Sequence, residues 1–213
     1  MPNAIPMAAD IISFLDTDEL PILFQRLGSH PAYLQTTWDK YQTVMQLPEI
    51  DRRTKELMGF VVAVAKTCDY MMAFQRQRAQ AAGLDVDATL EALAVADFFI
   101  GFDAFAHALH IDSELRPRRL LAGDTSLIDQ EFNVNVPYVR DTQDETVQKV
   151  YQDIQHTMNI PFVPNIFKAL AHQPDALQAK WQGYKTIMRS GSLASLTKEL
   201  LAVAVSAVNA CFY

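Results

Sequence analysis

The clearest pattern in the chain is an apolar stripe with the period of an α-helix. Leu34, Trp38, Tyr41 and Met45 are spaced so that they share one helix face, and Pro31 stands where it can occupy the first helical position. The same stripe recurs later in the chain, at Leu177, Trp181, Tyr184 and Met188. The pattern predicts two equivalent amphipathic helices.

Further helical stretches are predicted between and after these two. Residues 68–82 read as a helix closed by Gly83 in a left-handed conformation, and 87–109 as a helix capped by Asp87. Residues 112–141 break the periodicity, and Thr142 with Glu145 then forms a predicted capping box. Because no stretch alternates apolar and polar residues long enough to require a sheet, we expect an all-α fold.

The two stripes belong to a longer internal repeat with an offset of 143 residues. Seventeen of the 50 positions from 21 to 70 are identical to their counterparts from 164 to 213, against roughly three expected from average residue usage. We therefore predict a first repeat over 1–111, a connector over 112–141 and a second repeat over 142–213. The first copy continues helical for about 40 residues beyond Tyr70. The second copy is incomplete in this chain, either because it has lost its back half or because the chain is part of a longer product.

Composition narrows the class of protein. Half of the 213 residues are hydrophobic, the net charge is -7, and basic residues do not gather into a patch, which argues against nucleic acid as a partner. The apolar runs and the first ten residues predict neither a membrane span nor a signal peptide, so we expect a cytoplasmic protein. The chain has two cysteines, which is too few for a disulfide framework.

A motif repeats around those cysteines. The sequence "TKELLAVAVSAVNACFY" ends the second copy, and "TKELMGFVVAVAKTCDY" stands in the first. Both resemble the signature of the AhpD-like, or carboxymuconolactone decarboxylase, family, which reads Glu, eleven residues, Cys, two residues, Cys, three residues, His. In the first copy the likeness continues through "AQAAGL" and "ALAVADFFIGFDAFAHAL". The resemblance implies a duplicated AhpD-like helical bundle, a homo-oligomer and, in active members, reduction of hydroperoxides by a cysteine pair.

The sequence also departs from this signature. Glu56 and Cys68 match in the first copy, but Met71 and Gln75 stand at the second-cysteine and histidine positions. In the second copy Glu199 and Cys211 match, and the remaining two positions would be 214 and 218. The resemblance therefore places the candidate site in the second copy, with Cys211 as the first motif cysteine and Glu199 assisting proton transfer.

The chemistry of this family sets a structural requirement. A thiolate attacks the O–O bond, becomes a sulfenic acid and is recovered by a second thiol, so the expected partners are a hydroperoxide and a thiol or protein reductant, without cofactor or metal. An unbroken helix would separate Glu199 and Cys211 by about 18 Å along its axis. We therefore expect the helix to break just before each cysteine, at Thr67 and Asn209, with Thr67 as the cap of the next helix.

Other readings stay open. Cys68 is predicted to be a small buried hydrophobe, and Trp38 and Trp181 to be core residues. His107 and His110 share a helix face, but no third metal ligand has convincing spacing. The alternatives to a peroxidase are a catalytically degenerate structural or oligomeric family member and a muconolactone-type decarboxylase.

Overall fold

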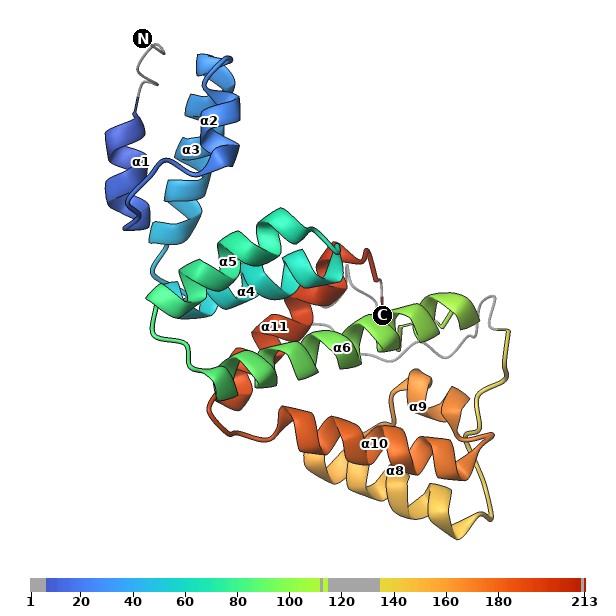
Figure 1. Ribbon diagram of the computed structural model, residues 1–213. Coiled ribbons are helices and arrows are strands. Elements are labelled where there is room, and N and C mark those ends of the chain that lie inside the picture. Colours follow the sequence, from blue (N-terminus) through green and yellow to red (C-terminus); the bar gives the residue numbers. More distant parts are fainter. Residues whose placement is uncertain (1–6, 112, 115–134, 212) are drawn as a thin grey trace.

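The predicted all-α fold is confirmed by a computed structural model of the chain, which describes residues 7–111, 113–114, 135–211 and 213. These residues form no strand and ten helices (Figure 1). The helices are α1 (Ala8–Leu15), α2 (Ile22–Leu27), α3 (Pro31–Gln46), α4 (Arg52–Ala65), α5 (Asp69–Ala81), α6 (Val86–Leu109), α8 (Glu145–Met158), α9 (Asn165–Leu170), α10 (Pro174–Met188) and α11 (Ser195–Val208).

The helices form a central layer flanked by two three-helix groups. Helices α4, α5, α6 and α11 pack together in the middle of the molecule, α1 to α3 lie at one end, and α8 to α10 lie at the other (Figure 1). The central core contains Leu57, Val61, Val95, Leu201 and Val205, all at most 1% exposed. Separate apolar clusters fill the two end groups.

Helix α6 runs through the center and joins the central layer to the α8–α10 group. It is long and apolar enough, by length and composition, to cross a membrane. Its apolar surface instead packs against α4, α10 and α11, and the rings of Phe98 and Phe102 contact Tyr184 and Phe167 at centroid distances of 6.1 and 5.6 Å. Burial between neighbouring helices therefore accounts for part of its hydrophobicity, since 39% of its apolar window is buried.

The helix bounds follow the repeat offset closely. Helices α2, α3 and α4 begin 143 residues before α9, α10 and α11, respectively. The two tryptophans make equivalent hydrogen bonds: Trp38 Nε1 donates to Asp10 Oδ2 at 2.6 Å, and Trp181 Nε1 donates to Asp153 Oδ2 at 2.7 Å. The predicted division into two repeats stays a prediction, and these correspondences agree with it. The middle of the predicted connector, 115–134, lies outside the described residues.

Several helix ends agree with the sequence. Pro31 occupies the first turn of α3, and Gly83, with φ +82°, follows the end of α5 in the left-handed region. The predicted core positions Trp38 and Trp181 are at most 2% exposed and belong to the apolar clusters of their own end groups, whereas Met188 joins the central core.

Two predicted caps are wrong by two residues. Helix α6 is capped by Asp85, whose carboxylate accepts from the Ala88 N–H at 2.8 Å, and Asp87 lies in the first turn. Helix α8 is capped by Asp144, which accepts from the Val147 N–H, while the Thr142 hydroxyl accepts from the Asp144 N–H. In each case a nearby aspartate lies in the extended conformation that an N-cap requires, and it takes that place.

Candidate active site

Helix α11 breaks just before Cys211, as the chemical interpretation required. The helix ends at Val208, Asn209 follows as its C-cap, and Ala210 has a left-handed φ of 54°. The Cys211 N–H then donates to the Ser206 carbonyl oxygen at 3.0 Å. This turn brings the cysteine back beside the last turn of the helix.

The first copy contains the same break with one difference from the prediction. Thr67 has a φ of 49° and the Cys68 N–H donates to the Ala63 carbonyl oxygen at 3.1 Å. The predicted cap at Thr67 is wrong, because Cys68, with the extended backbone typical of an N-cap, takes that place one residue later. Cys68 itself is the N-cap of α5 and its side chain is half-buried.

The carboxylate of Asp103 lies beside the Cys211 thiol. Asp103 comes from α6, is 5% exposed, and accepts hydrogen bonds from Ser206 Oγ at 2.9 Å and Asn209 Nδ2 at 3.0 Å. Burial is the largest cause that raises the pKa of the Cys211 thiol; a hydrogen bond with the Tyr213 backbone lowers this pKa, and the charge and hydrogen bond of Asp103 raise it. The site therefore holds Cys211 as a protonated thiol beside a base.

Glu199 faces a different partner. Its Oε1 accepts from the Tyr184 hydroxyl at 3.4 Å, and partial burial raises the pKa of the Glu199 carboxyl. Burial, followed by the charge of Glu199, raises the pKa of Tyr184 to about 12. Seven helical residues separate Glu199 from Ser206, or about 10 Å along the axis. Proton transfer between Glu199 and Cys211 would therefore need an intermediary.

One cavity extends between these two groups. It has a volume of about 220 Å³, and its lining includes both Glu199 with Tyr184 and Asp103 with Ser206. Three phenylalanines, Phe99, Phe102 and Phe167, supply much of its apolar wall. A small, largely apolar molecule in this cavity would meet a carboxylate of raised pKa and the carboxylate that contacts the thiol.

The corresponding position in the first copy is closed by ion pairs. Glu56, the counterpart of Glu199, is 0% exposed, and its Oε1 lies 2.7 Å from Arg52 Nε and 3.6 Å from Arg78 Nε. Gln75 packs so closely on Gly59 that a Cβ there would lie 2.8 Å from the Gln75 side chain. The first copy therefore fills the position with its own side chains.

The sequence alone did not single out Asp103, Ser206, Asn209 or Tyr184 as site residues. A signal existed for Asp103, since it is a carboxylate in the apolar run "DFFIGFDAFAHAL". A buried carboxylate inside a core helix marks a site candidate because burial without hydrogen bonds is costly.

Of the two histidines at the end of α6, His107 lies near the turn that precedes Cys211. His107 Nε2 lies 3.2 Å from the Ala210 carbonyl oxygen, and His110 is the C-cap of the helix. Within the described part of the chain, no three His, Cys, Asp or Glu side chains are grouped so that they could hold a metal ion. A hydrogen bond across the turn before Cys211 is the contact observed for His107.

Comparison of the chain with curated proteins and with solved structures gave no match. A family model, that of the carboxymuconolactone decarboxylase family, matches residues 31–114. The match spans α3 to α6 and includes Glu56, Cys68 and Asp103, while Glu199 and Cys211 lie outside it. Over this segment the chain is similar to the carboxymuconolactone decarboxylase family, and this match agrees with the resemblance noted in the sequence.

Proposed function

We propose that the protein is a thiol-dependent peroxidase of AhpD-like type, with Cys211 as the reacting residue. The observation that carries the proposal is the half-buried Cys211 thiol with the buried carboxylate of Asp103 beside it, because Asp103 also lines the cavity with aromatic walls. A cysteine that only fills space in a core does not need a hydrogen-bonded carboxylate at its sulfur.

In the proposed first step, Asp103 accepts the thiol proton as the sulfur attacks the terminal, hydrogen-bearing oxygen of the hydroperoxide. An S–O bond forms, the O–O bond breaks, and the proton passes from Asp103 to the departing alkoxide, which leaves as an alcohol. Cys211 is oxidised to a sulfenic acid and the hydroperoxide is reduced. The pKa of Cys211 is raised, so removal of its proton by a base matters more here than for a preformed thiolate.

The sulfenic acid is then reduced by an external thiol in this proposal. The external thiol attacks the sulfur, water leaves, and a second equivalent of thiol releases Cys211 from the mixed disulfide. The reductant is thus a small thiol or a protein dithiol, and the oxidised product is its disulfide.

Peroxide consumption by the full chain, with dithiothreitol as reductant and tert-butyl hydroperoxide as substrate, tests this proposal. We expect Cys211→Ser to abolish turnover and Cys68→Ser, the matched control, to retain it. A dimedone adduct found by mass spectrometry on Cys211 after peroxide treatment would support the first step. Equal turnover by the wild type and Cys211→Ser would rule the proposal out.

A second candidate function is proton transfer on a small organic acid or lactone, as the decarboxylase name of the family suggests. The observation that favours it is Glu199, whose pKa is raised, paired with Tyr184 at the cavity. Carboxylates of raised pKa serve as general acids or bases near neutral pH. In that case Glu199→Gln would remove turnover of a muconolactone-type substrate, and Cys211→Ser would leave it unchanged. If neither chemistry is found, the structural family member becomes the better interpretation.

The expected homo-oligomer and cytoplasmic location remain part of this proposal. Light scattering of the purified chain would decide the first, and cell fractionation the second.

A further inference from the structure

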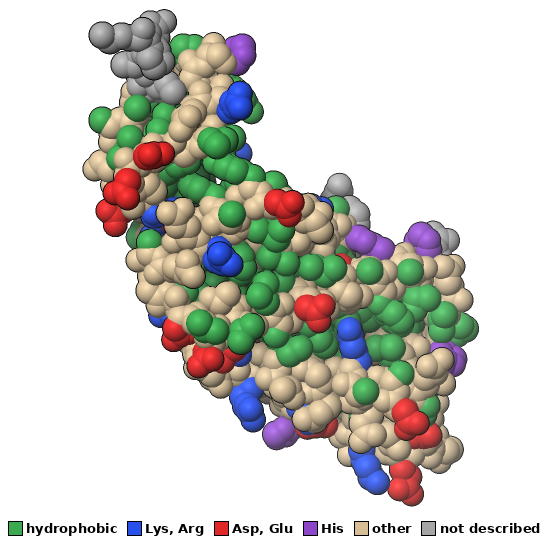
Figure 2. Space-filling view, in the orientation of Figure 1, with side chains coloured by type: hydrophobic (Ala, Val, Ile, Leu, Met, Phe, Trp, Pro, Cys, Tyr) green, Lys and Arg blue, Asp and Glu red, His purple; other side chains and the backbone are tan. Residues whose placement is uncertain are grey.

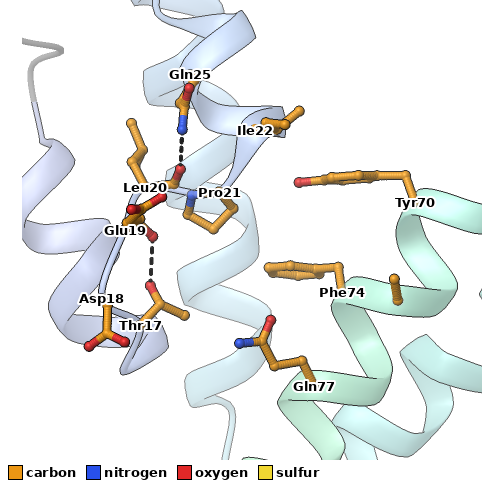
Figure 3. A pocket seen from close by; sticks show the side chains of 11 residues that line it. Thr17, Asp18, Glu19, Leu20, Pro21, Ile22, Gln25, Tyr70, Phe74 and Gln77 are labelled. Carbon is orange, nitrogen blue, oxygen red and sulfur yellow. Dashed lines mark hydrogen bonds between the residues drawn. The ribbon is translucent and has the colours of Figure 1, made fainter.

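A second cavity lies between the α1–α2 turn and helix α5, away from Cys211. It has a volume of about 490 Å³ (Figure 3). The rings of Tyr70 and Phe74 stack nearly parallel, 6.3 Å apart and at 9°, and face Pro21 and Ile22 across the cavity (Figure 3). Exposed apolar surface continues around it, since Ile22 is 59% and Tyr70 38% exposed. We call this cavity the Tyr70 groove.

The backbone beside the Tyr70 groove has a counterpart in the second copy. The Leu23 N–H donates to the Tyr70 hydroxyl oxygen at 3.0 Å, and the Ile166 N–H donates to the Tyr213 hydroxyl oxygen at 3.1 Å. The two pairs are related by the repeat offset of 143 residues. The second copy therefore shows which other group can contact such a tyrosine hydroxyl.

In the second copy the side chain of Glu114, which follows α6 in the chain, contacts the tyrosine of this pair. The Tyr213 hydroxyl donates to Glu114 Oε1 at 2.5 Å, and the same carboxylate accepts from the Asn165 N–H. Burial and the Glu114 charge raise the pKa of Tyr213 well above its ordinary value. In the second copy the tyrosine hydroxyl thus donates to a carboxylate from a distant part of the chain.

We propose that the Tyr70 groove is a docking site for an extended peptide segment of a partner protein, with a carboxylate on the Tyr70 hydroxyl. The hydroxyl accepts from Leu23 and keeps its own proton to donate, as Tyr213 does to Glu114. The stacked rings of Tyr70 and Phe74 supply an apolar platform for the rest of the segment.

The charges at the groove refine the chemistry of this partner. The Tyr70 hydroxyl points toward Ile22, whereas Asp18 lies toward the opposite end of the groove, past Glu19 (Figure 3). Both acidic side chains are exposed. A purely anionic segment would be repelled at that end, so the fitting segment carries a basic residue near the carboxylate.

The test is binding of a labelled peptide with the sequence of residues 109–116, LHIDSELR, to the full chain by fluorescence anisotropy. This segment contains Glu114 and, two residues later, Arg116. Tyr70→Phe should weaken binding about tenfold, because it removes a hydrogen bond to a charged acceptor. Tyr33→Phe is the matched control at a tyrosine that is 63% exposed, and it should leave the Kd unchanged.

A double-mutant cycle makes the assignment specific. A peptide with Glu114→Gln should bind weakly and about equally to the wild type and Tyr70→Phe, because the two changes remove the same contact. Arg116→Gln should also weaken binding and lower its salt dependence. In ¹⁵N spectra the Leu23 amide should shift on titration.

Other results would overturn the proposal. No binding at millimolar peptide, or a Kd unaffected by Tyr70→Phe with an unmoved Leu23 amide, excludes a carboxylate site in this groove. Binding lost in Tyr213→Phe but kept in Tyr70→Phe would place the peptide in the second copy instead.

Discussion

The two copies use the same glutamate in opposite ways. Glu56 is completely buried between Arg52 and Arg78, whereas Glu199 is exposed beside Tyr184 at the mouth of a cavity. Both follow the same Thr-Lys pair and lie at the same position of their helices, α4 and α11. The comparison teaches that the motif glutamate alone does not define a site, because the neighbouring side chains decide whether it is buried in ion pairs or accessible at a cavity.

The helix faces that carry the two glutamates also differ in exposure. Helix α5 covers the Glu56 face of α4, so that Phe60 is only 5% exposed. On α11 the matching residue Val203 is 64% exposed, and Leu196, on the same face, is 71% exposed. Figure 2 shows how apolar side chains are distributed over one side of the molecule. The first copy has therefore closed its glutamate into a core, and the second copy leaves it accessible.

The largest expected effect is on stability, and it comes from the buried glutamate. Glu56→Gln should lower the free energy of unfolding by about 3 kcal/mol, because it leaves two guanidinium groups without their carboxylate. Urea unfolding followed by circular dichroism measures this change. Glu199→Gln is the matched control and should change stability by less than about 0.5 kcal/mol, as expected at an exposed position. Equal losses in the two variants would contradict the proposed difference between the copies.

The next prediction concerns Cys211. Burial and Asp103 both raise the pKa of its thiol, so alkylation by iodoacetamide should increase with pH up to a midpoint above 9. Asp103→Asn should move this midpoint lower and speed alkylation at pH 8, since one of the two causes is removed. Mass spectrometry of the Cys211 peptide gives the rate, with Asp97→Asn on the exposed side of α6 as the control. An unchanged midpoint in Asp103→Asn would show that burial alone sets the pKa.

The same variant separates reactivity from catalysis. If Asp103 is the base of the proposed reaction, Asp103→Asn should alkylate faster and yet consume peroxide more slowly. If alkylation and peroxide consumption both became faster, Asp103 would act only by disfavouring the thiolate form of Cys211.

The sequence predicted the fold better than the site for a physical reason. Periodic stripes and residues such as Pro31 and Gly83 act within a few positions of the chain, so the sequence predicts their helices directly. The Asp103–Cys211 contact joins α6 to the end of α11 across more than a hundred residues, and no local pattern encodes it. The register of Glu199 and Cys211 pointed to α11, but it could not show that Tyr184 lies beside Glu199 or that Asp103 lies near Cys211.

A smaller effect is expected at alkaline pH, where the titration of Tyr184 in the second copy should change the stability of the protein. Folding raises the pKa of Tyr184 to about 12 from an ordinary value of 10, so the unfolded chain loses this proton first. The stabilising effect is complete below pH 10 and is lost as the pH rises from 10 to 12. After allowance for solvent screening, the wild type should lose about 1 kcal/mol more than Tyr184→Phe over this window. Urea midpoints at pH 9 and 11 measure the difference, and parallel losses in the two proteins would argue against a buried hydroxyl.

The smallest expected effect compares the two tryptophan–aspartate bonds. Asp153 also accepts from Lys185 Nζ at 2.6 Å, whereas Gln42 occupies the lysine position in the first copy. The hydrogen bonds from Lys185 and Trp181 lower the pKa of Asp153, so its stabilising effect is present above the ordinary carboxyl pKa of 3.8 and is lost as the pH falls through the lowered value. Because both side chains are about a third exposed or more, Asp153→Asn should cost at most about 1 kcal/mol at pH 7.

Asp10→Asn is the comparison for this prediction, because Asp10 bonds to Trp38 alone among the contacts described for its carboxylate. Thermal unfolding in low and high salt should show a salt-dependent cost for Asp153→Asn and a salt-independent one for Asp10→Asn, since screening weakens only the pair with lysine. A salt-independent cost at both positions would mean that the bond to tryptophan, and not the lysine, dominates in each copy. The outcome thus decides whether the added lysine strengthens the second copy or merely lies beside an aspartate that tryptophan already holds.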